Sequence, residues 1–328
     1  MFAGFLNKGF RDSLALLVIL FLLGFAAVYL APVSLESDHY PNLFYNYFTQ
    51  HISGKLIITL LNFLFIGMGV FLVSLIAVNQ EVVDKLNYFP VFLYLLIAVV
   101  CVHPHQVTPQ LLTNVFIFYS IYKLLDTYRN DRVLSHIFEG AFVLSCSAFI
   151  TISSIISIPL FFIILLILRT FYWREWVMAL LGFITPVFIY ECMAYLTNFN
   201  RWYLFDATAL YFESLRPPSF SEYYIALSIC LFALLIIGIL SNIIRGFGNT
   251  VKKQRARSIL LWFLLFSLPG FFSGGANSSS IILTYALPLS LFIGDLLFNL
   301  RRTKIANTVL AALIFCALLV FLGEYGMF

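Results

Sequence analysis

Residues 34–48, SLESDHYPNLFYNYF, gather side chains that could do chemistry in a chain that is otherwise mostly apolar. Glu36, Asp38 and His39 lie close together there and are followed by a run of aromatic residues. A carboxylate beside a membrane-embedded cavity can act as a general base on an acceptor hydroxyl or amine, or can bind a metal that holds a phosphate. The same residues also fit an ordinary solvated loop. The sequence therefore leaves a catalytic and a solvated interpretation open.

Two histidines and a third carboxylate occur where other apolar segments end. His103 and His105 flank Pro104, and a two-residue separation in an extended chain points both rings to the same side, which suits a shared metal or phosphate. Zinc sites use three or four protein ligands, and no third ligand has a recognisable spacing, so we predict no metal and no other cofactor. Glu191 lies near the outer end of its apolar run, where it faces either a polar site or the interface.

Two more carboxylates, Glu139 and Asp295, lie within apolar runs toward the other side of the membrane. Ionisable groups are costly in lipid and usually have a partner. We expect Arg132 and Arg301 to be those partners, and both carboxylates to be helix-end charges.

Composition indicates what kind of protein must position these groups. The 328 residues are 62% hydrophobic and 10% charged, whereas about a quarter of the residues in a soluble domain are charged. The five cysteines show no CxxC spacing, which argues against a disulfide framework or a structural zinc site. No GxxxxGK[ST], GxGxxG, HExxH or GxSxG motif is present. The chain is predicted to be one all-α integral membrane domain over residues 1–328.

Apolar runs between polar breaks predict about eleven membrane segments by the usual span length. The third and sixth are short enough to be tilted or re-entrant, and the ninth ends in the SLPGFFSGGANSSS break at 267–280, which is either a re-entrant bend or an external turn. The predicted segments are 13–31, 56–79, 88–102, 107–125, 133–152, 154–169, 177–197, 222–244, 258–273, 280–299 and 305–322.

The distribution of basic residues predicts the orientation. With a cytoplasmic N-terminus, 16 of the 19 lysines and arginines fall on the cytoplasmic side, and only Lys55, Arg201 and Arg216 fall outside, as the positive-inside rule requires. The basic run 245–258 is then expected to be a topogenic loop near anionic lipid, not a nucleic-acid patch, and WREW at 173–176 an interfacial anchor. The first external loop, 32–55, and the long loop 198–220 lie outside, and the C-terminus is external.

The order of these features resembles the polytopic glycosyltransferases of the GT-C type, over roughly the first 200 residues. ESDHYPNLFYNYF is similar to that family's first external loop, with Asp38 at its acidic position, although His39 follows where the family commonly has a second acid. HPHQVTPQLLTNVFIFYSIYKLLDTYRNDR resembles its short pair of helices, and residues 139–186 resemble its next repeat. Residues 201–328 would add C-terminal transmembrane helices. The chain also resembles an uncharacterised family of bacterial polytopic inner-membrane proteins.

The resemblance implies a transferase that uses a polyprenyl-phosphate-linked sugar at the external face of a bacterial inner membrane. Asp38 would be the catalytic carboxylate, with Glu36 and His39 in support. Arg201 and Arg216 would bind phosphate, since a guanidinium matches phosphate oxygens. His103, His105 and Glu191 would complete the polar cavity, and a groove between helices would admit the lipid tail.

Two other functions fit the same sequence. A noncatalytic scaffold would keep the fold and bind other inner-membrane proteins, which suits the small loops. A transporter would need a polar cavity near the bilayer midplane and commonly an internal repeat. We find no inverted repeat in the sequence, and the few charges within apolar runs are sparse for a coupled ion pathway.

Overall fold

The computed structural model describes residues 10–30, 54–79, 83, 87–103, 106–128, 133–169, 171–197, 208–209, 222–244, 251–268, 278–300 and 303–324. This part of the chain is helical and contains no strand. Each of the predicted apolar segments corresponds to helix. The helices are α2 (Phe10–Leu30), α4 (Lys55–Asn79), α5 (Phe89–Val100), α6 (Pro109–Asp126), α7 (Val133–Ala148), η1 (Ile152–Ile156), α8 (Ser157–Leu168), α9 (Trp173–Thr197), α11 (Glu222–Ile244), α12 (Val251–Ser267), α13 (Ser278–Thr284), α14 (Ala286–Phe298) and α15 (Thr303–Glu324).

Two expected boundaries are wrong in an informative way. The basic residues from Val251 onward were expected in a loop but form the first turns of α12, and WREW forms the first turn of α9. Lysine and arginine are good helix formers and their long side chains reach the interface from a helix end. A basic run beside an apolar run therefore extends the helix instead of ending it.

Two other segments are divided by proline. The predicted segment 280–299 breaks at Tyr285 between α13 and α14, and segment 154–169 begins with the 3-10 turn η1 before α8. Pro288 and Pro159 lie in the first turns of α14 and α8. A proline lacks an N–H and its ring clashes with the carbonyl four residues earlier, so it is favoured in the first turn of a helix and disfavours helix before it.

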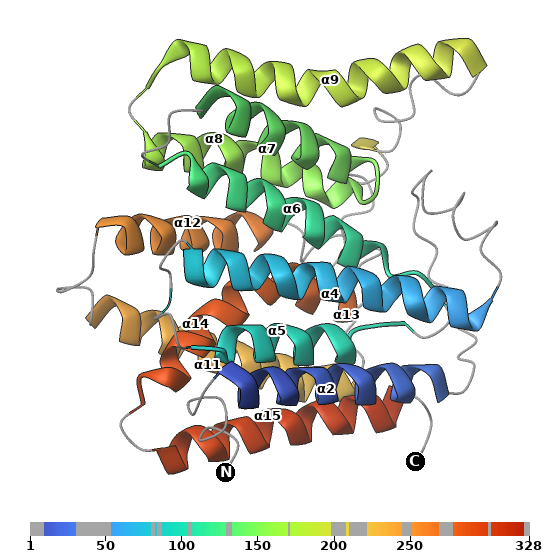
Figure 1. Ribbon diagram of the computed structural model, residues 1–328, viewed down its shortest axis with the longest axis vertical. Coiled ribbons are helices and arrows are strands. Elements are labelled where there is room, and N and C mark those ends of the chain that lie inside the picture. The colour runs from blue at the N-terminus through green and yellow to red at the C-terminus, as the bar shows by residue number, and fades with distance from the viewer. Residues whose placement is uncertain are drawn as a thin grey trace.

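The helices lie side by side in one stack, and the chain runs back and forth between the two ends of the stack (Figure 1). The short helices α5 and α14 pack against each other at its centre, with α4, α2 and α15 also on α5 and with α11 on α14. Both are buried along almost their whole length. At one edge of the stack, α9 packs chiefly on α7.

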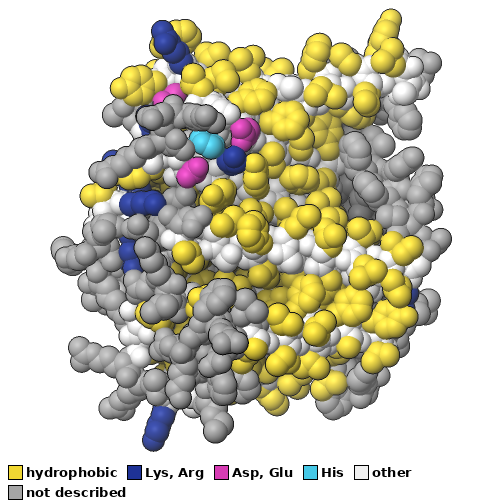
Figure 2. All heavy atoms as spheres, in the orientation of Figure 1, with side chains coloured by type: hydrophobic (Ala, Val, Ile, Leu, Met, Phe, Trp, Pro, Cys, Tyr) yellow, Lys and Arg dark blue, Asp and Glu magenta, His cyan; other side chains and the backbone are white. Residues whose placement is uncertain are grey.

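Four helical stretches are long and apolar enough to cross a membrane: Lys55–Val78, Trp173–Thr197, Glu222–Ile243 and Lys304–Gly323. Several of the other helices are apolar but shorter, α5 with 12 residues and α14 with 13 among them. Large apolar side chains are exposed along the outer helices, as Figure 2 shows for one face. Such a surface is suited to lipid, and the protein is a membrane protein.

Basic side chains collect at one end of the stack. The lysines and arginines with described side chains, other than Lys55, lie in the first two turns of α9, α12 and α15, in the last turn of α6 or at the end of α8, and these helix ends lie where α2 also begins, which we call the basic end (Figure 1). These residues are Lys123, Arg169, Arg174, Lys252, Lys253, Arg255, Arg257 and Lys304. Figure 2 shows basic side chains on that side of one face. The end where α4, α6 and α11 begin is called the opposite end.

The central pair of helices depends on a glycine. A Cβ added at Gly294 of α14 would lie 2.6 Å from Pro90 Cγ and 2.7 Å from the Pro90 backbone nitrogen of α5. Gly67 of α4, by contrast, has no atom within 4 Å of the same position. Small residues allow such close helix approach in membrane bundles, where packing drives association.

We predict opposite effects for alanine at these two glycines. Gly294→Ala should destabilise the protein by about 1–3 kcal/mol because the proline ring and its backbone cannot move away without separating α5 from α14. Gly67→Ala should be neutral or stabilise by about 0.5–1 kcal/mol, since it adds helix propensity without a clash. Thermal unfolding of both variants in the same detergent measures this difference. Equal transition temperatures would contradict the packing described for the central pair.

Candidate functional site

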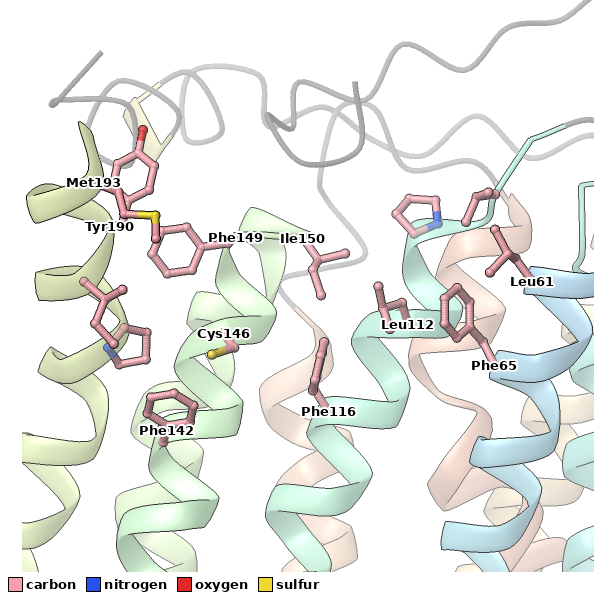
Figure 3. Close-up of a pocket in the computed structure, with 14 residues that line it drawn as sticks. Leu61, Phe65, Leu112, Phe116, Phe142, Cys146, Phe149, Ile150, Tyr190 and Met193 are labelled. Atoms are coloured by element: carbon pink, nitrogen blue, oxygen red, sulfur yellow. The ribbon is translucent and has the colours of Figure 1, made fainter. Parts of the chain in front are cut away.

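An apolar groove lies between described helices near the opposite end (Figure 3). Its volume is about 440 Å³, within the range of small-molecule sites. Its surface is almost wholly apolar and rich in aromatic rings. It is lined by Leu61, Phe65, Val107, Pro109, Leu112, Phe116, Phe142, Cys146, Phe149, Ile150, Pro186, Ile189, Tyr190 and Met193.

Four helices form the walls of the groove. They pack in the order α4, α6, α7 and α9, each against the next, so α4 and α9 form its two outer walls (Figure 3). Cys146 and Phe116 project into it from α7 and α6 in the middle. The face of the stack made by these helices is largely apolar (Figure 2). A hydrocarbon chain that lies along this face can therefore enter the groove without leaving an apolar environment.

Pro186 shapes the α9 wall. It lies inside α9, and its missing N–H and its ring disturb the preceding turn. The carbonyl of Phe183 in that turn accepts a hydrogen bond of 2.9 Å from Ser145 Oγ on α7. This bond holds α9 to α7 below the groove, while Pro186, Ile189, Tyr190 and Met193 line it above that point.

A single buried side chain organises the loop between α5 and α6. Asn62 of α4 is fully buried, and its Nδ2 donates to the carbonyl oxygens of His103 at 3.1 Å and Gln106 at 2.9 Å. Its Oδ1 accepts from the Thr108 backbone N–H at 2.9 Å. The loop also bonds to itself, since the His103 N–H donates to Thr108 Oγ1 at 3.3 Å.

The depth of this loop explains why the amide is needed. With a rise of 1.5 Å per residue, α5 is about 18 Å long, whereas the hydrocarbon layer is about 30 Å thick. Asn62 is seven residues after Lys55, the first residue of α4, which places it about 10 Å along the helix at 1.5 Å per residue. The loop that it holds is therefore at membrane depth. Irregular backbone is tolerated there only when its polar groups are satisfied within the protein or by a water-filled cavity.

More buried hydrogen bonds continue from this loop into the bundle. His103 Nε2 is 3.1 Å from Ser279 Oγ of α13. Asn114 Nδ2 donates to the Leu283 carbonyl at 2.9 Å, which ties α6 to α13. Thr113 Oγ1 is 2.9 Å from Thr151 Oγ1 next to η1. The start of α6 is thus joined by polar contacts to α13 and to Thr151, and the residue before it, Thr108, is joined to α4.

The structure describes two of the residues that the sequence suggested for a site. His103 and Glu191 both lie at the opposite end, separated by the groove: the loop of His103 contributes Val107 to one wall, and Tyr190, beside Glu191, belongs to the other. Neither His103 nor Glu191 is itself among the lining residues, and both side chains are half-buried. The other suggested residues lie outside the described part of the chain; they are Glu36, Asp38, His39, His105, Arg201 and Arg216.

Metal ligands do not gather within the described residues. No group of three or more histidine, cysteine, aspartate or glutamate side chains is close enough there to hold an ion. Sequence reasoning also missed Asn62, although an amide within the apolar run 56–73 is the kind of residue that marks an internal polar contact in a membrane helix.

The two remaining carboxylates form ion pairs near the basic end. Glu139 Oε2 lies 2.7 Å from Lys123 Nζ, and Asp295 Oδ2 lies 3.1 Å from Arg257 Nη2. The expected partners, Arg132 and Arg301, lie outside the described residues. Lys123 reaches Glu139 because α6 and α7 are neighbours, and Arg257 reaches Asp295 because the helical start of α12 lies beside α14. Asp295 is additionally held by Asn299 Nδ2 at 3.2 Å.

Comparisons with known protein families, curated proteins and solved structures were made for the whole chain. None finds a match.

The two ion pairs should differ in their effect on stability. Asp295 and Arg257 side chains are 5% and 13% exposed, whereas Glu139 is 41% exposed. Arg257→Met should cost about 3–5 kcal/mol because it leaves a buried carboxylate uncompensated, and adding Asp295→Leu should recover most of that loss. Lys123→Met should cost at most about 1 kcal/mol.

Unfolding measurements on Arg257→Met, Asp295→Leu, the double variant and Lys123→Met test this expectation. A double variant no more stable than Arg257→Met would show that the two side chains are not coupled as a buried pair.

Proposed function

We propose that this protein is a membrane-embedded glycosyltransferase of the GT-C type that acts on a polyprenyl-phosphate-linked sugar at the external face of a bacterial inner membrane. The apolar groove supports this proposal most directly, because it offers a lipid tail an aromatic-lined site next to the loop that carries His103. An isoprenoid tail is wholly apolar and gains free energy from every apolar surface that it covers. The groove is the place where such a tail would bind.

The orientation belongs to the same proposal. The basic end would be cytoplasmic by the positive-inside rule, because it carries every described lysine and arginine side chain except Lys55. The groove would then lie in the outer half of the bilayer. Eleven crossings, an N-terminus inside and a C-terminus outside would follow from the alternating helices, with α13 and α14 together making one crossing.

The chemistry would take place where the groove meets the external loops. Asp38 would remove the proton from an acceptor hydroxyl or amine while that atom attacks the anomeric carbon of the donor sugar. The bond from that carbon to the phosphate oxygen would break, and polyprenyl phosphate would leave. Arg201 and Arg216 would hold the phosphate, and Glu36, His39, His103, His105 and Glu191 would line the polar part of the site.

A noncatalytic scaffold is the second candidate function. The outer face of α9 favours it, because Leu181, Ile184 and Phe188 are 49–65% exposed and α9 packs chiefly on α7. Such a helix could bind the transmembrane segment of another inner-membrane protein. The two functions differ in what the groove must hold, and the following experiments separate them.

We predict that a bulky residue in the groove blocks lipid binding. Cys146→Trp should lower the affinity of the purified protein for a fluorescent polyprenyl phosphate by at least about tenfold, since the indole would occupy the space of the tail. Cys192→Trp is the matched control. Cys192 is an exposed residue in the half of α9 that borders the groove, but it does not line the groove. Binding that both variants retain would exclude the groove as the tail site.

We also predict a specific loss on Asp38→Asn in cells that lack the native gene. The protein level should be normal, the glycan made by the enzyme should be absent, and the lipid-linked donor should accumulate. The reason is that an asparagine amide cannot take the proton from the hydroxyl or amine of the acceptor substrate. Measurement of envelope glycans and lipid-linked sugars by mass spectrometry gives all three quantities. An unchanged glycan profile at normal protein level would exclude Asp38 from the chemistry and favour the scaffold.

A further inference from the structure

We propose that Asn62 is a positioning residue that fixes the width of the mouth of the groove, the opening between Leu61 and Phe65 on one side and Val107 and Pro109 on the other. It thereby controls how the lipid tail enters the groove. Leu61 and Phe65 of α4 line one wall, and Val107 and Pro109 at the end of the loop line the next. Asn62 lies on α4 beside the first pair and bonds to the loop that carries the second. Its three hydrogen bonds therefore hold the α4 wall to the loop at the start of α6. This proposal rests on the proposed function for the identity of the tail.

Only a primary amide makes this set of bonds with one side chain. Asn62 donates to two carbonyl oxygens and accepts from one N–H, and an amide has two donor hydrogens and one acceptor oxygen. An aspartate would keep the bond from Thr108 but would have one donor when protonated and none when ionised, and the ionised form would face two carbonyl oxygens. Leucine has a similar shape and makes none of the bonds.

The loop has a polar side and an apolar side. On the polar side His103 reaches Ser279 of α13, and on the apolar side Val107 faces the groove. Release of Asn62 would remove one hydrogen-bond partner from each of two carbonyls and one N–H of the loop, in a part of the bundle where replacement by water is costly. The loop would then have to move toward water or other donors, and Val107 and Pro109 would move with it. The three hydrogen bonds of Asn62 therefore determine the width of the mouth.

Asn114 supplies a matched control. It is also a buried asparagine, and its Nδ2 also donates to a backbone carbonyl of another element, Leu283 of α13. It bonds neither to the 101–108 loop nor to a lining residue in the described hydrogen bonds, and it does not line the groove. Asn114→Leu thus removes a similar buried amide that bonds α6 to α13 and not to the loop that Asn62 holds.

The test uses the full chain in lipid nanodiscs and two probes. In one, a polyprenyl phosphate with a photoreactive group near the middle of its tail is cross-linked, and the labelled residues are mapped by peptide mass spectrometry. In the other, Cys146 is alkylated by a small apolar maleimide in a chain whose other four cysteines are alanine. The variants Asn62→Leu, Asn62→Asp and Asn114→Leu are compared at equal amounts of folded protein.

We expect Asn62→Leu and Asn62→Asp to reduce cross-linking at Phe116 and Phe142 by about tenfold, the effect of one or two net hydrogen bonds. They should also raise the alkylation rate of Cys146 severalfold, while Asn114→Leu changes neither quantity. Equal effects of Asn62→Leu and Asn114→Leu would reduce Asn62 to a general contributor to stability and overturn the proposal.

The two probes separate this proposal from the proposed function. No cross-link in the groove of the native sequence would contradict binding of a polyprenyl tail there. The Cys146 rate would still decide the role of Asn62, because it reports the mouth without any lipid ligand. An unchanged rate in Asn62→Leu would overturn the positioning role whatever the lipid does.

Discussion

Backbone polar groups inside a bilayer must find partners within the protein, and the short central helices make this requirement severe. With 12 residues, α5 alone is shorter than the hydrocarbon layer is thick, and the turn that follows it lies at membrane depth. Asn62 satisfies the turn that follows α5. Asn87 satisfies the turn before it, by accepting from the Phe89 N–H and donating to the Gly294 carbonyl of α14. The position of the loop before α6, and hence the part of the groove lined by Val107 and Pro109, depends on the contacts of Asn62.

Apolar run length was sufficient to predict the helices, because in lipid every backbone group must be satisfied and helix satisfies it locally. Run length could not show that 280–299 divides at Tyr285 or that the basic start of α12 is helical. Those features depend on proline placement and on the reach of long charged side chains. Run length marked the segment of α5 as short, but it could not show which neighbouring helices bury it.

The candidate site was predictable only in kind. A groove between helices for a lipid tail was expected, but its walls come from four helices that are far apart in sequence, and no local pattern specifies that α4, α6, α7 and α9 pack in this order. Sequence proximity suggested Arg132 and Arg301 as partners of Glu139 and Asp295, and both arginines lie outside the described residues. The packed helices bring Lys123 and Arg257 to these carboxylates, and local sequence did not suggest either contact. The catalytic role of Asp38 stays a prediction.

The most direct test of the central claim is an experimental structure of the full chain in nanodiscs with added polyprenyl phosphate. The account predicts continuous tail density along Phe116 and Cys146, with the phosphate at the external end near the loop that Asn62 holds. A tail bound against another face of the bundle, with the groove filled by side chains or empty, would contradict it.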